Sequence, residues 1–204
     1  MTIADSPLVN VAEIDPSIVL DIRYATRENI AGHPLYREPM CLIHRDAAEP
    51  LARVQAELRR GNSGLKIFDA YRPPSAQRAL WQVISDPRYV ADPNNARHTR
   101  GTAVDVTLVA LDFLTHEVEY EVAMPTGFDE MTERAHRDSQ SENMQIWANR
   151  RMLDRVMIKH GFEPFATEWW HFDLHGWQSY PQLTVEDFAA DSSEVKRAGM
   201  PLPL

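Results

Sequence analysis

The sequence predicts an α+β fold, and three observations carry this prediction. Runs of β-forming residues and segments with apolar side chains at helical spacing occur in mixed order along the 204 residues. They do not follow the regular alternation of strand and helix that is typical of a doubly wound parallel sheet. The length fits one domain, because compact domains usually contain about 100–200 residues. We therefore expect a single domain over residues 1–204, with a core at about 17–178 and a polar C-terminal tail at 181–204.

The N-terminal part of the chain is expected to hold two strands and two helices. A run rich in β-branched and aromatic residues at 17–24 predicts the first strand. Apolar residues at helical spacing predict a helix over 47–60, with Pro50 in its first turn, where the missing N–H costs little. The apolar run 65–70 predicts a strand that ends before two prolines. A helix follows over 75–84, with its first serine as the N-cap.

The C-terminal part is expected to add a hairpin, a long helix and an aromatic strand. A loop rich in proline, asparagine and charged residues is predicted over 86–100. An alternating strand over 103–109 follows, with a hairpin partner within 111–122. The strongest helical periodicity covers 142–160, and the strand-like segment covers 162–174.

Composition and charge exclude several classes of protein. The net charge of −9 argues against a nucleic-acid binder and against binding to an anionic membrane surface. No apolar run approaches the roughly 18 residues of a membrane span. Cys41 is the single cysteine, which rules out an intrachain disulfide and a cysteine-rich metal site. The N-terminus lacks the features of a signal peptide, so we expect a cytoplasmic protein, or a periplasmic one if a leader is missing from the chain.

A first cluster of residues that could bind a metal or take part in catalysis lies between His98 and Asp105. His98 ends the predicted loop, Gly101 permits a tight turn, and Asp105 lies in the β-rich run. An imidazole and a carboxylate that meet across such a turn are suitable zinc ligands. The simpler interpretation, in which Asp105 caps a turn and His98 is an ordinary loop residue, stays open for this cluster alone.

A second cluster contains Glu168 and His171 on either side of two tryptophans. A glutamate and a histidine among aromatic residues suit a zinc ligand beside a general base in a partly dry pocket. The alternative is a core strand whose glutamate reaches solvent. On a regular strand, positions three apart point to opposite faces. If both residues serve one site, the backbone must therefore bulge, or Glu168 must reach round from the beginning of the strand.

Together, the two clusters predict a catalytic zinc site with one zinc ion per chain. His98, Asp105 and His171 supply three ligands and leave a fourth position for water, and Glu168 is the natural base. Arg72 follows a predicted strand and precedes two prolines, so it could stabilise the oxyanion of a tetrahedral intermediate. The alternative for Arg72 is a surface arginine in a salt bridge.

These residues resemble the zinc D-alanyl-D-alanine dipeptidases of the VanX type, which are grouped with the D,D-peptidases and share the fold of hedgehog signalling domains. The resemblance covers roughly residues 20–172. Its motifs, in chain order, are Asp21-Ile-Arg-Tyr24-Ala-Thr, Asp69-Ala-Tyr-Arg72-Pro, His98-Thr-Arg-Gly-Thr-Ala-Val-Asp105, Gly127-Phe-Asp129-Glu-Met131 and Glu168-Trp-Trp-His171. Each motif is weak alone, but five in the same order with compatible spacing are specific.

The resemblance implies a small, mostly antiparallel sheet with flanking helices, and it implies roles for individual residues. The two histidines and Asp105 named above would bind zinc, Glu168 would be the base, and Arg72 would steady the transition state. Tyr24 and Asp129 would lie near the free ammonium group of the substrate. A carboxylate and a phenol oxygen can both accept hydrogen bonds from that group. The alternative for Asp129 is a loop aspartate that caps the turn after Gly127.

The expected function is therefore zinc-dependent hydrolysis of D-alanyl-D-alanine or a similar small dipeptide, with a link to the bacterial cell wall. Two rivals stay open: a D,D-carboxypeptidase or peptidoglycan endopeptidase that accepts longer peptides, and a zinc-binding module without catalysis. The carboxypeptidase relatives typically end in His-x-His, and His171-Phe-Asp-Leu-His175 does not match that motif. Ala96 stands where the family usually has serine, which leaves the exact dipeptide preference open. The oligomeric state is open as well.

Overall fold

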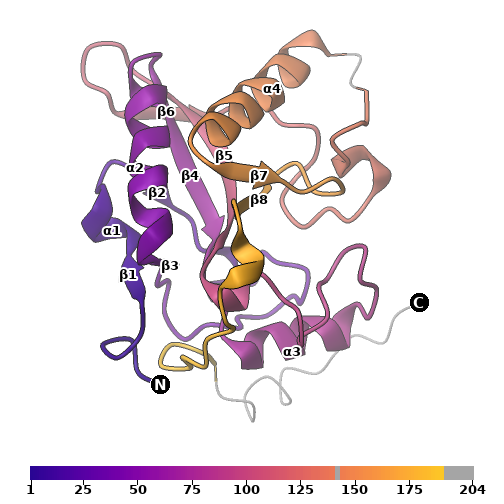
Figure 1. Ribbon diagram of the computed structural model, residues 1–204. Helices are drawn as coiled ribbons and strands as arrows, with labels where there is room; N and C mark the ends of the chain where they lie inside the picture. The colour runs from indigo at the N-terminus through magenta and orange to yellow at the C-terminus, as the bar shows by residue number, and fades with distance from the viewer. Residues whose placement is uncertain (141–142, 191–204) are drawn as a thin grey trace.

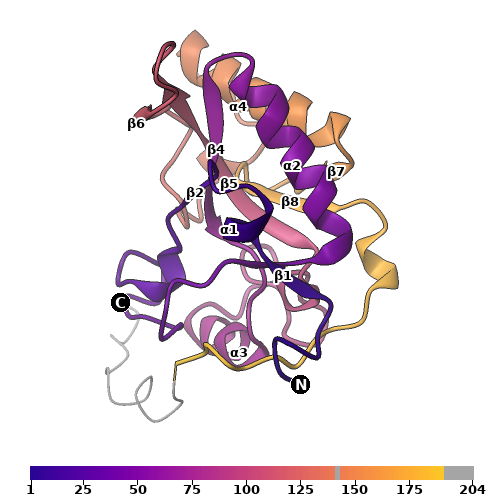
Figure 2. The same ribbon diagram turned by 90° about the vertical axis from the view of Figure 1, so that its left-hand side faces the viewer.

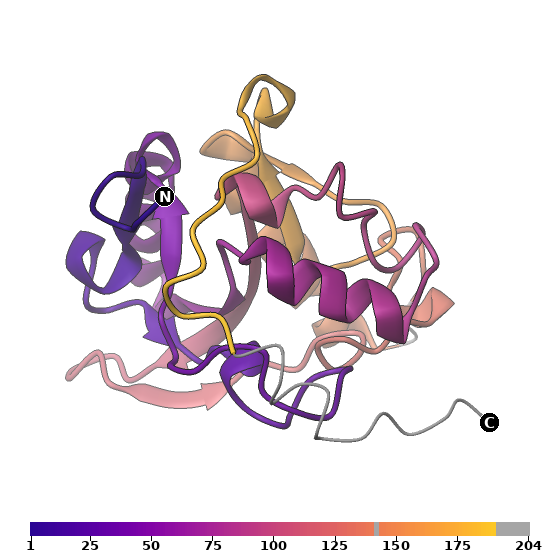
Figure 3. The same ribbon diagram turned by 90° about the horizontal axis from the view of Figure 1, so that it is seen from below.

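The computed structural model describes residues 1–140 and 143–190, and it confirms the α+β prediction. A twisted sheet lies at the centre of the molecule (Figure 1). Helix α2 (Arg45–Arg59) packs against the sheet beside helix α4 (Met144–Lys159), and the two helices contact each other (Figure 1, Figure 2). Helix α3 (Pro74–Val83) lies across the lower end of the sheet, where the view from below shows it in front (Figure 3).

The main sheet is mostly antiparallel, as expected. Its strands, in spatial order, are β2 (Val19–Leu20), β4 (Ser63–Asp69), β5 (Ala103–Leu111), β8 (His171–Leu174) and β7 (Phe162–Pro164). The predicted hairpin partner of β5 is β6 (Val118–Glu121), which pairs with the end of β5 that β8 leaves free. Among the described strands of this sheet, β2 and β4 form the single parallel pair.

The other elements are short. They are β1 (Leu8–Asn10), α1 (Val11–Ile14) and β3 (Leu42–His44), together with the 3₁₀ turns η1 (Arg23–Ala25), η2 (His98–Arg100), η3 (Glu133–Ala135) and η4 (Trp177–Ser179). Strands β1 and β3 form a separate antiparallel pair. Within the described ranges, every helix is too short or too polar to cross a bilayer.

The strand predicted at 17–24 is mostly wrong. Strand pairing is limited to Val19 and Leu20, and the chain then turns into η1. The carbonyl of Tyr24 accepts hydrogen bonds from the amides of Leu35 and Tyr36, so the backbone is satisfied by a loop instead of a neighbouring strand. Strand propensity therefore gave way to tertiary contacts, which is common for short β-rich runs.

The starts of α2 and α3 also differ from the prediction. Helix α2 begins at Arg45 because the side chain of His44 caps it by accepting from the amide of Asp46. Pro50 consequently lies inside the helix and not in its first turn. Helix α3 begins at Pro74, and Ser75 is not its N-cap, because its hydroxyl and amide both donate to Glu186.

Helix α4 matches the prediction over 144–159, whereas position 142 lies outside the described residues. The helix ends at Lys159, and Gly161 follows its C-cap His160 with a φ of +95°, which favours glycine. The segment 162–174 contains two paired strands, β7 and β8, with a loop over 165–170 between them.

The hydrophobic core extends beyond the expected range of 17–178. Leu8 and Val11 are buried at its N-terminal side, and Val185 and Phe188 are buried at its C-terminal side. The expected tail is therefore packed against the protein up to residue 190, and positions 191–204 lie outside the described residues. From below, this segment passes between the N-terminal elements and α3 (Figure 3).

The C-terminal segment supports the backbone next to Arg72. The hydroxyl of Tyr71 donates to the carbonyl of Val185 at 2.9 Å and accepts from the amide of Val185 at 3.0 Å. Because Tyr71 is buried and directly precedes Arg72, residues near the end of the described chain help to fix the end of β4.

Candidate active site

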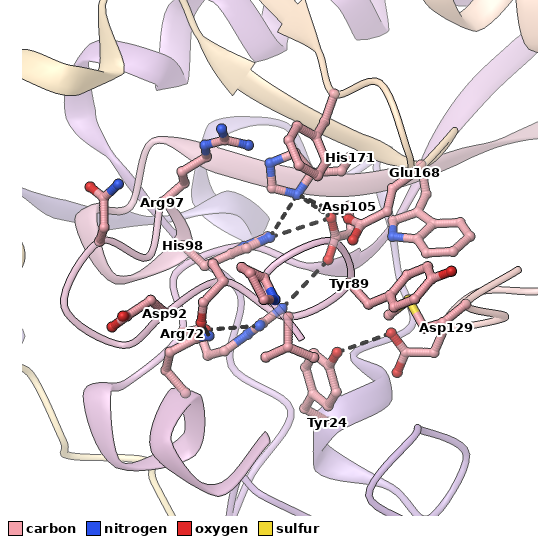
Figure 4. Close-up of a pocket in the computed structure, with 18 residues that line it drawn as sticks. Tyr24, Arg72, Tyr89, Asp92, Arg97, His98, Asp105, Asp129, Glu168 and His171 are labelled. Atoms are coloured by element: carbon pink, nitrogen blue, oxygen red, sulfur yellow. Dashed lines mark hydrogen bonds and ion pairs between the residues drawn. The ribbon is translucent and has the colours of Figure 1, made fainter. Parts of the chain in front are cut away.

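Three potential metal ligands from three elements meet at the lower end of the sheet. His98 begins η2, Asp105 lies in β5 and His171 begins β8, where it is the register partner of Asp105. The Nε2 atom of His98 lies 3.1 Å from Nδ1 of His171, and Oδ1 of Asp105 lies 3.0 Å from the same Nδ1 atom. One ligand atom from each residue lies within 4.8 Å of the others, and all three side chains are buried (Figure 4).

The turn that presents His98 depends on Gly101. Its φ of +71° is a left-handed conformation that favours glycine, and its amide donates to the carbonyl of His98. A Cβ atom at this position would lie 2.6 Å from the side chain of Leu8 and 3.1 Å from the backbone nitrogen of His44, so another residue would force these neighbours to shift. The local sequence therefore dictates where the imidazole of His98 is placed.

The orientation of both imidazoles fits a shared cation. Nδ1 of His98 lies 2.6 Å from the carbonyl oxygen of Ala70, and Nε2 of His171 lies 3.0 Å from Oδ1 of Asp173. Both oxygens accept hydrogen bonds, so each ring carries its proton on the side away from the partner ring. The facing nitrogens are then directed toward a position that they share with Asp105. This donor set of two nitrogens and one carboxylate oxygen is one that zinc prefers.

The surrounding charges also favour a cation. Burial lowers the pKa of His171, but the carboxylates of Asp173 and Asp105 outweigh it and raise this pKa to about 10. Burial raises the pKa of Asp105, yet His98 and His171 hold it well below its usual range. Asp105 thus places negative charge beside the facing nitrogens, and Asp173 places a second negative charge on the far side of the His171 ring.

Glu168 lies beside the three donors because it precedes the strand. The regular strand β8 begins only at His171, and Glu168 belongs to the preceding turn, so it reaches the same side as His171. Its Oε2 atom lies 3.8 Å from Nδ1 of His171. Burial raises the pKa of Glu168 to about 8, although the nearby His171 acts in the opposite direction.

Arg72 is buried, and it forms an ion pair as well. Its Nε and Nη2 atoms lie 2.9 Å and 2.8 Å from Oδ2 of Asp69, and Nη1 donates to Oε1 of Gln77 at 2.9 Å. Nη2 lies 3.7 Å from Asp105, so the guanidinium faces the group of metal ligands. It also lies over the ring of Tyr24, at 4.7 Å from the centroid.

Tyr24 and Asp129 lie together on the opposite side of the pocket (Figure 4). Burial raises the pKa of Tyr24 well above its ordinary value, so its hydroxyl stays protonated and donates to Oδ1 of Asp129 at 3.1 Å. The amide of Ile30 donates to Oδ2 at 3.1 Å. Asp129 has a φ of +61° and caps no turn of its own, because its side chain reaches distant residues. Burial raises its pKa to about 7.

The candidate metal ligands, Glu168, Arg72, Tyr24 and Asp129 all line one cavity of about 210 Å³. This volume is below the range of roughly 300–1,000 Å³ for pockets that hold drug-sized ligands, so the site suits a smaller molecule. The loop predicted at 86–100 forms one wall. Its residues at the cavity are Pro87, Tyr89, Val90, Ala91, Asp92, Asn95, Arg97 and His98.

Two residues at the site were missed from sequence. Gln77 connects Arg72 to the wall of the cavity, since its amide nitrogen donates to the carbonyl of Ala91 at 2.7 Å. No local pattern could have revealed this contact. Asp173 was within reach of prediction, because residues two apart on a strand point to the same face and Asp173 follows His171 by two.

Comparisons with known proteins show the family of the chain. The family model of D-Ala-D-Ala dipeptidases matches residues 4–190. The D-alanyl-D-alanine dipeptidase of Escherichia coli is 40% identical over 177 residues, which are 86% of this chain and 89% of that protein. The enzyme of the same name from Enterococcus faecium is 31% identical over 192 residues, covering 83% of this chain and 91% of that protein.

Among solved structures, a distant likeness exists to the vancomycin resistance D,D-pentapeptidase VanY in complex with Zn(II). The identity is 16%, the TM-score is 0.43, and the match covers 68% of this chain and 76% of that one. The family model and the curated relatives, in contrast, span most of the sequence at substantial identity. The chain is therefore a peptidase, and it belongs to the D-alanyl-D-alanine dipeptidase family.

Proposed function

We propose that this peptidase hydrolyses D-alanyl-D-alanine, or a closely similar small dipeptide, with one zinc ion held by His98, Asp105 and His171. The observation that carries the proposal is the convergence of these donors with Glu168 in one small cavity. The choice of dipeptide comes from the curated relatives of that name. We also propose that residues 1–204 form one peptidase domain.

The donor set fits zinc, because two imidazole nitrogens and a carboxylate face one another at a buried position. Zinc held there would supply Lewis acidity toward the peptide carbonyl and would lower the pKa of a water molecule to about 7. The carboxylate of Asp173 and the carbonyl of Ala70 keep the two imidazoles in the tautomers that this role needs.

Glu168 is the proposed general base. Its carboxylate accepts the proton of the attacking water and later donates that proton to the amine of the leaving alanine. Glu168 is buried beside aromatic residues, including Trp169 and Trp170, which shield the proton transfer from bulk water.

Arg72 is the proposed stabiliser of the negative charge that develops on the carbonyl oxygen. Asp69 and Gln77 hold the guanidinium in place before substrate arrives. Stabilisation of a developing oxyanion by donors that are already oriented is among the largest contributions to peptide hydrolysis.

Asp129 and Tyr24 are proposed to recognise the free ammonium group of the dipeptide. A dipeptidase must bind that charge, and Asp129 supplies a carboxylate whose position is held by Tyr24 and Ile30. A carboxypeptidase that trims longer peptides meets an uncharged amide at the same point. The carboxylate therefore favours a dipeptidase.

Metal analysis of the purified protein, combined with alanine release from three substrates, tests the proposal. We expect about one zinc per chain and hydrolysis of D-alanyl-D-alanine, with little or none of L-alanyl-L-alanine or N-acetyl-D-alanyl-D-alanine. Equal cleavage of the acetylated compound would indicate a carboxypeptidase. Bound zinc without any hydrolysis would indicate a binding module.

A further inference from the structure

The loop that carries Glu168 connects β7 and β8. Within the described part of the chain, the Glu168 carboxylate makes one polar contact, at 3.8 Å from Nδ1 of His171. The side chain is therefore placed by the backbone of the loop and not by hydrogen bonds of its own. Whatever holds the two ends of this loop together also determines where the carboxylate lies.

Arg137 spans both ends of that loop. Its Nε atom donates to the carbonyl of Phe165 at 2.7 Å, and its Nη2 atom donates to the carbonyl of His171 at 2.8 Å. Its backbone amide donates to the carbonyl of Ala166 at 2.9 Å. One residue thus contacts the loop at three backbone oxygens, and the planar guanidinium fixes the distance between two of them.

Neighbouring contacts add to the attachment of the loop, whose ends also meet directly where the amide of Phe165 donates to the carbonyl of His171 at 3.1 Å. The amide of Trp169, the residue next to Glu168, donates to the carbonyl of Ala135 at 3.0 Å. The indole nitrogen of Trp169 donates to the hydroxyl of Thr126 at 2.9 Å. The segment around Ala135 and Arg137 therefore holds the loop at its start, beside Glu168 and at its end.

Arg137 is itself fixed. Its Nη1 atom forms an ion pair with Asp154 of α4, and its guanidinium lies over the ring of Phe172 at 4.3 Å from the centroid. The side chain is 12% exposed, and burial lowers its pKa to about 10, because a buried cation is unfavourable. Such an arrangement is costly to maintain for a purely structural purpose, since apolar packing of similar volume is often as stable.

We propose that Arg137 is a positioning residue, which closes the 165–171 loop and thereby holds the Glu168 carboxylate at its distance from His171. The inference rests on the proposed role of Glu168 as the general base. Arg137 lies outside the residues that line the cavity, so it acts through Glu168 and does not touch substrate.

The experiment compares Arg137→Gln and Arg137→Lys with Arg134→Gln as the matched control. Arg134 lies in the same segment, but its side chain is 74% exposed. We expect Arg137→Gln to lower kcat by about 10–100-fold, because misplacing a reacting group by about 1 Å costs roughly that much. KM and zinc content should stay within about twofold, since the pocket and the ligands remain. Arg137→Lys should lose kcat as well, because a compact ammonium lacks the separate Nε and Nη2 donors that reach the two carbonyls. Arg134→Gln should match the parent.

Hydrogen exchange in the zinc-free protein gives a readout that is independent of activity. We expect the amides of 165–171 to exchange faster in Arg137→Gln and Arg137→Lys than in the parent, while β4 and β5 stay protected. Unchanged exchange in this loop, or an unchanged kcat in the folded lysine variant, would overturn the proposal. A fall in zinc affinity with kcat retained at saturating zinc would also overturn it, because Arg137 would then act on His171.

A second comparison separates this inference from the proposed function. In a Glu168→Ala background, Arg137→Gln should cause no further loss of kcat, since the group that it positions is already gone. An equal loss in both backgrounds would contradict the inference. If Glu168→Ala alone keeps the parental kcat, the proposed function fails, and the exchange data still show whether Arg137 closes the loop.

Discussion

Nε2 of His98 lies 3.1 Å from Nδ1 of His171, although 73 positions separate the two residues in the chain. Each ring has an acceptor for its remote nitrogen, so the near nitrogens both face Asp105 and a common cation position. A metal ion bound there would replace the proton that the raised pKa of His171 otherwise keeps on this ring. The first prediction follows from this contact.

Removal of zinc with a chelator is expected to abolish alanine release and to lower Tm, because a ligand that binds only the folded state stabilises it. Added zinc should restore both. His98→Ala should bind less than a tenth of the zinc that the parent binds, by metal analysis after dialysis. His175→Ala is the control, because that imidazole is 80% exposed and should leave zinc content unchanged. Full zinc content in His98→Ala would exclude it as a ligand.

Glu168→Gln should keep zinc but lose turnover. The amide cannot accept a proton, so kcat is expected to fall by about 10²–10⁴-fold, as for other general bases. Zinc content and kcat on D-alanyl-D-alanine are the measurements. Glu163→Gln changes a more exposed glutamate on β7 and serves as the control. Loss of metal from Glu168→Gln would instead assign Glu168 as a ligand.

Arg72→Lys should lower kcat more than it raises KM. The lysine retains a charge, but it cannot donate hydrogen bonds to both Asp69 and Gln77 and also face the reacting carbonyl. A reduction in kcat of about 10²–10³-fold is expected for loss of one oriented donor to the oxyanion. Steady-state kinetics separate the two constants, and Arg88→Lys, an exposed arginine, provides the comparison. A change confined to KM would show that Arg72 binds substrate in its ground state.

Asp129→Asn should reduce the preference for a free amino terminus. A hydrogen bond between charged groups contributes about 1.5–3 kcal/mol, so the ratio of kcat/KM for D-alanyl-D-alanine over its N-acetyl form should fall by about 10–100-fold. Asn keeps the size of the side chain and one acceptor for Tyr24 or Ile30. An unchanged ratio would place ammonium recognition elsewhere.

The pH dependence of KM provides an independent check on Asp129. Its pKa is raised to about 7, so the carboxyl gains its charge only as the pH rises through that value. A dipeptide loses its ammonium charge near pH 8. We therefore expect the lowest KM between these values and an increase of up to tenfold for each unit below pH 7. Asp129→Asn should remove the acidic limb, and persistence of that limb would assign it to another group.

Much of the fold could be predicted because periodicity is local. The apolar pattern of 142–160 and the alternating run that became β5 each specify an element within one stretch of chain. The strand predicted at 17–24 was mostly wrong because contacts distant in the chain decide its structure. The carbonyl of Tyr24 accepts hydrogen bonds from the amides of Leu35 and Tyr36. The burial of Val185 and Phe188 gave no periodic signal, because single apolar side chains in a polar segment fill gaps made by distant elements.

The site was partly readable for a different reason. His98, Asp105 and His171 could be predicted because they are residue types that bind zinc and lie beside a glycine turn or in a β-rich run. Their positions in space were not needed for this. Glu168 was also predicted, but the choice between a bulge and a reach from before the strand needed the structure, because it depends on where β8 begins. Gln77 and Arg137 were out of reach, since their importance lies wholly in carbonyl and side-chain partners far away in the chain.

The pairing of Tyr71 with Val185 has a consequence for biosynthesis. The ribosome synthesises Val185 more than a hundred residues after Tyr71, close to the end of the described chain. The candidate catalytic residues are therefore synthesised before the hydrogen bonds that fix the backbone beside Arg72 can form. This support for the backbone beside Arg72 is complete only once Val185 has been synthesised and has left the exit tunnel.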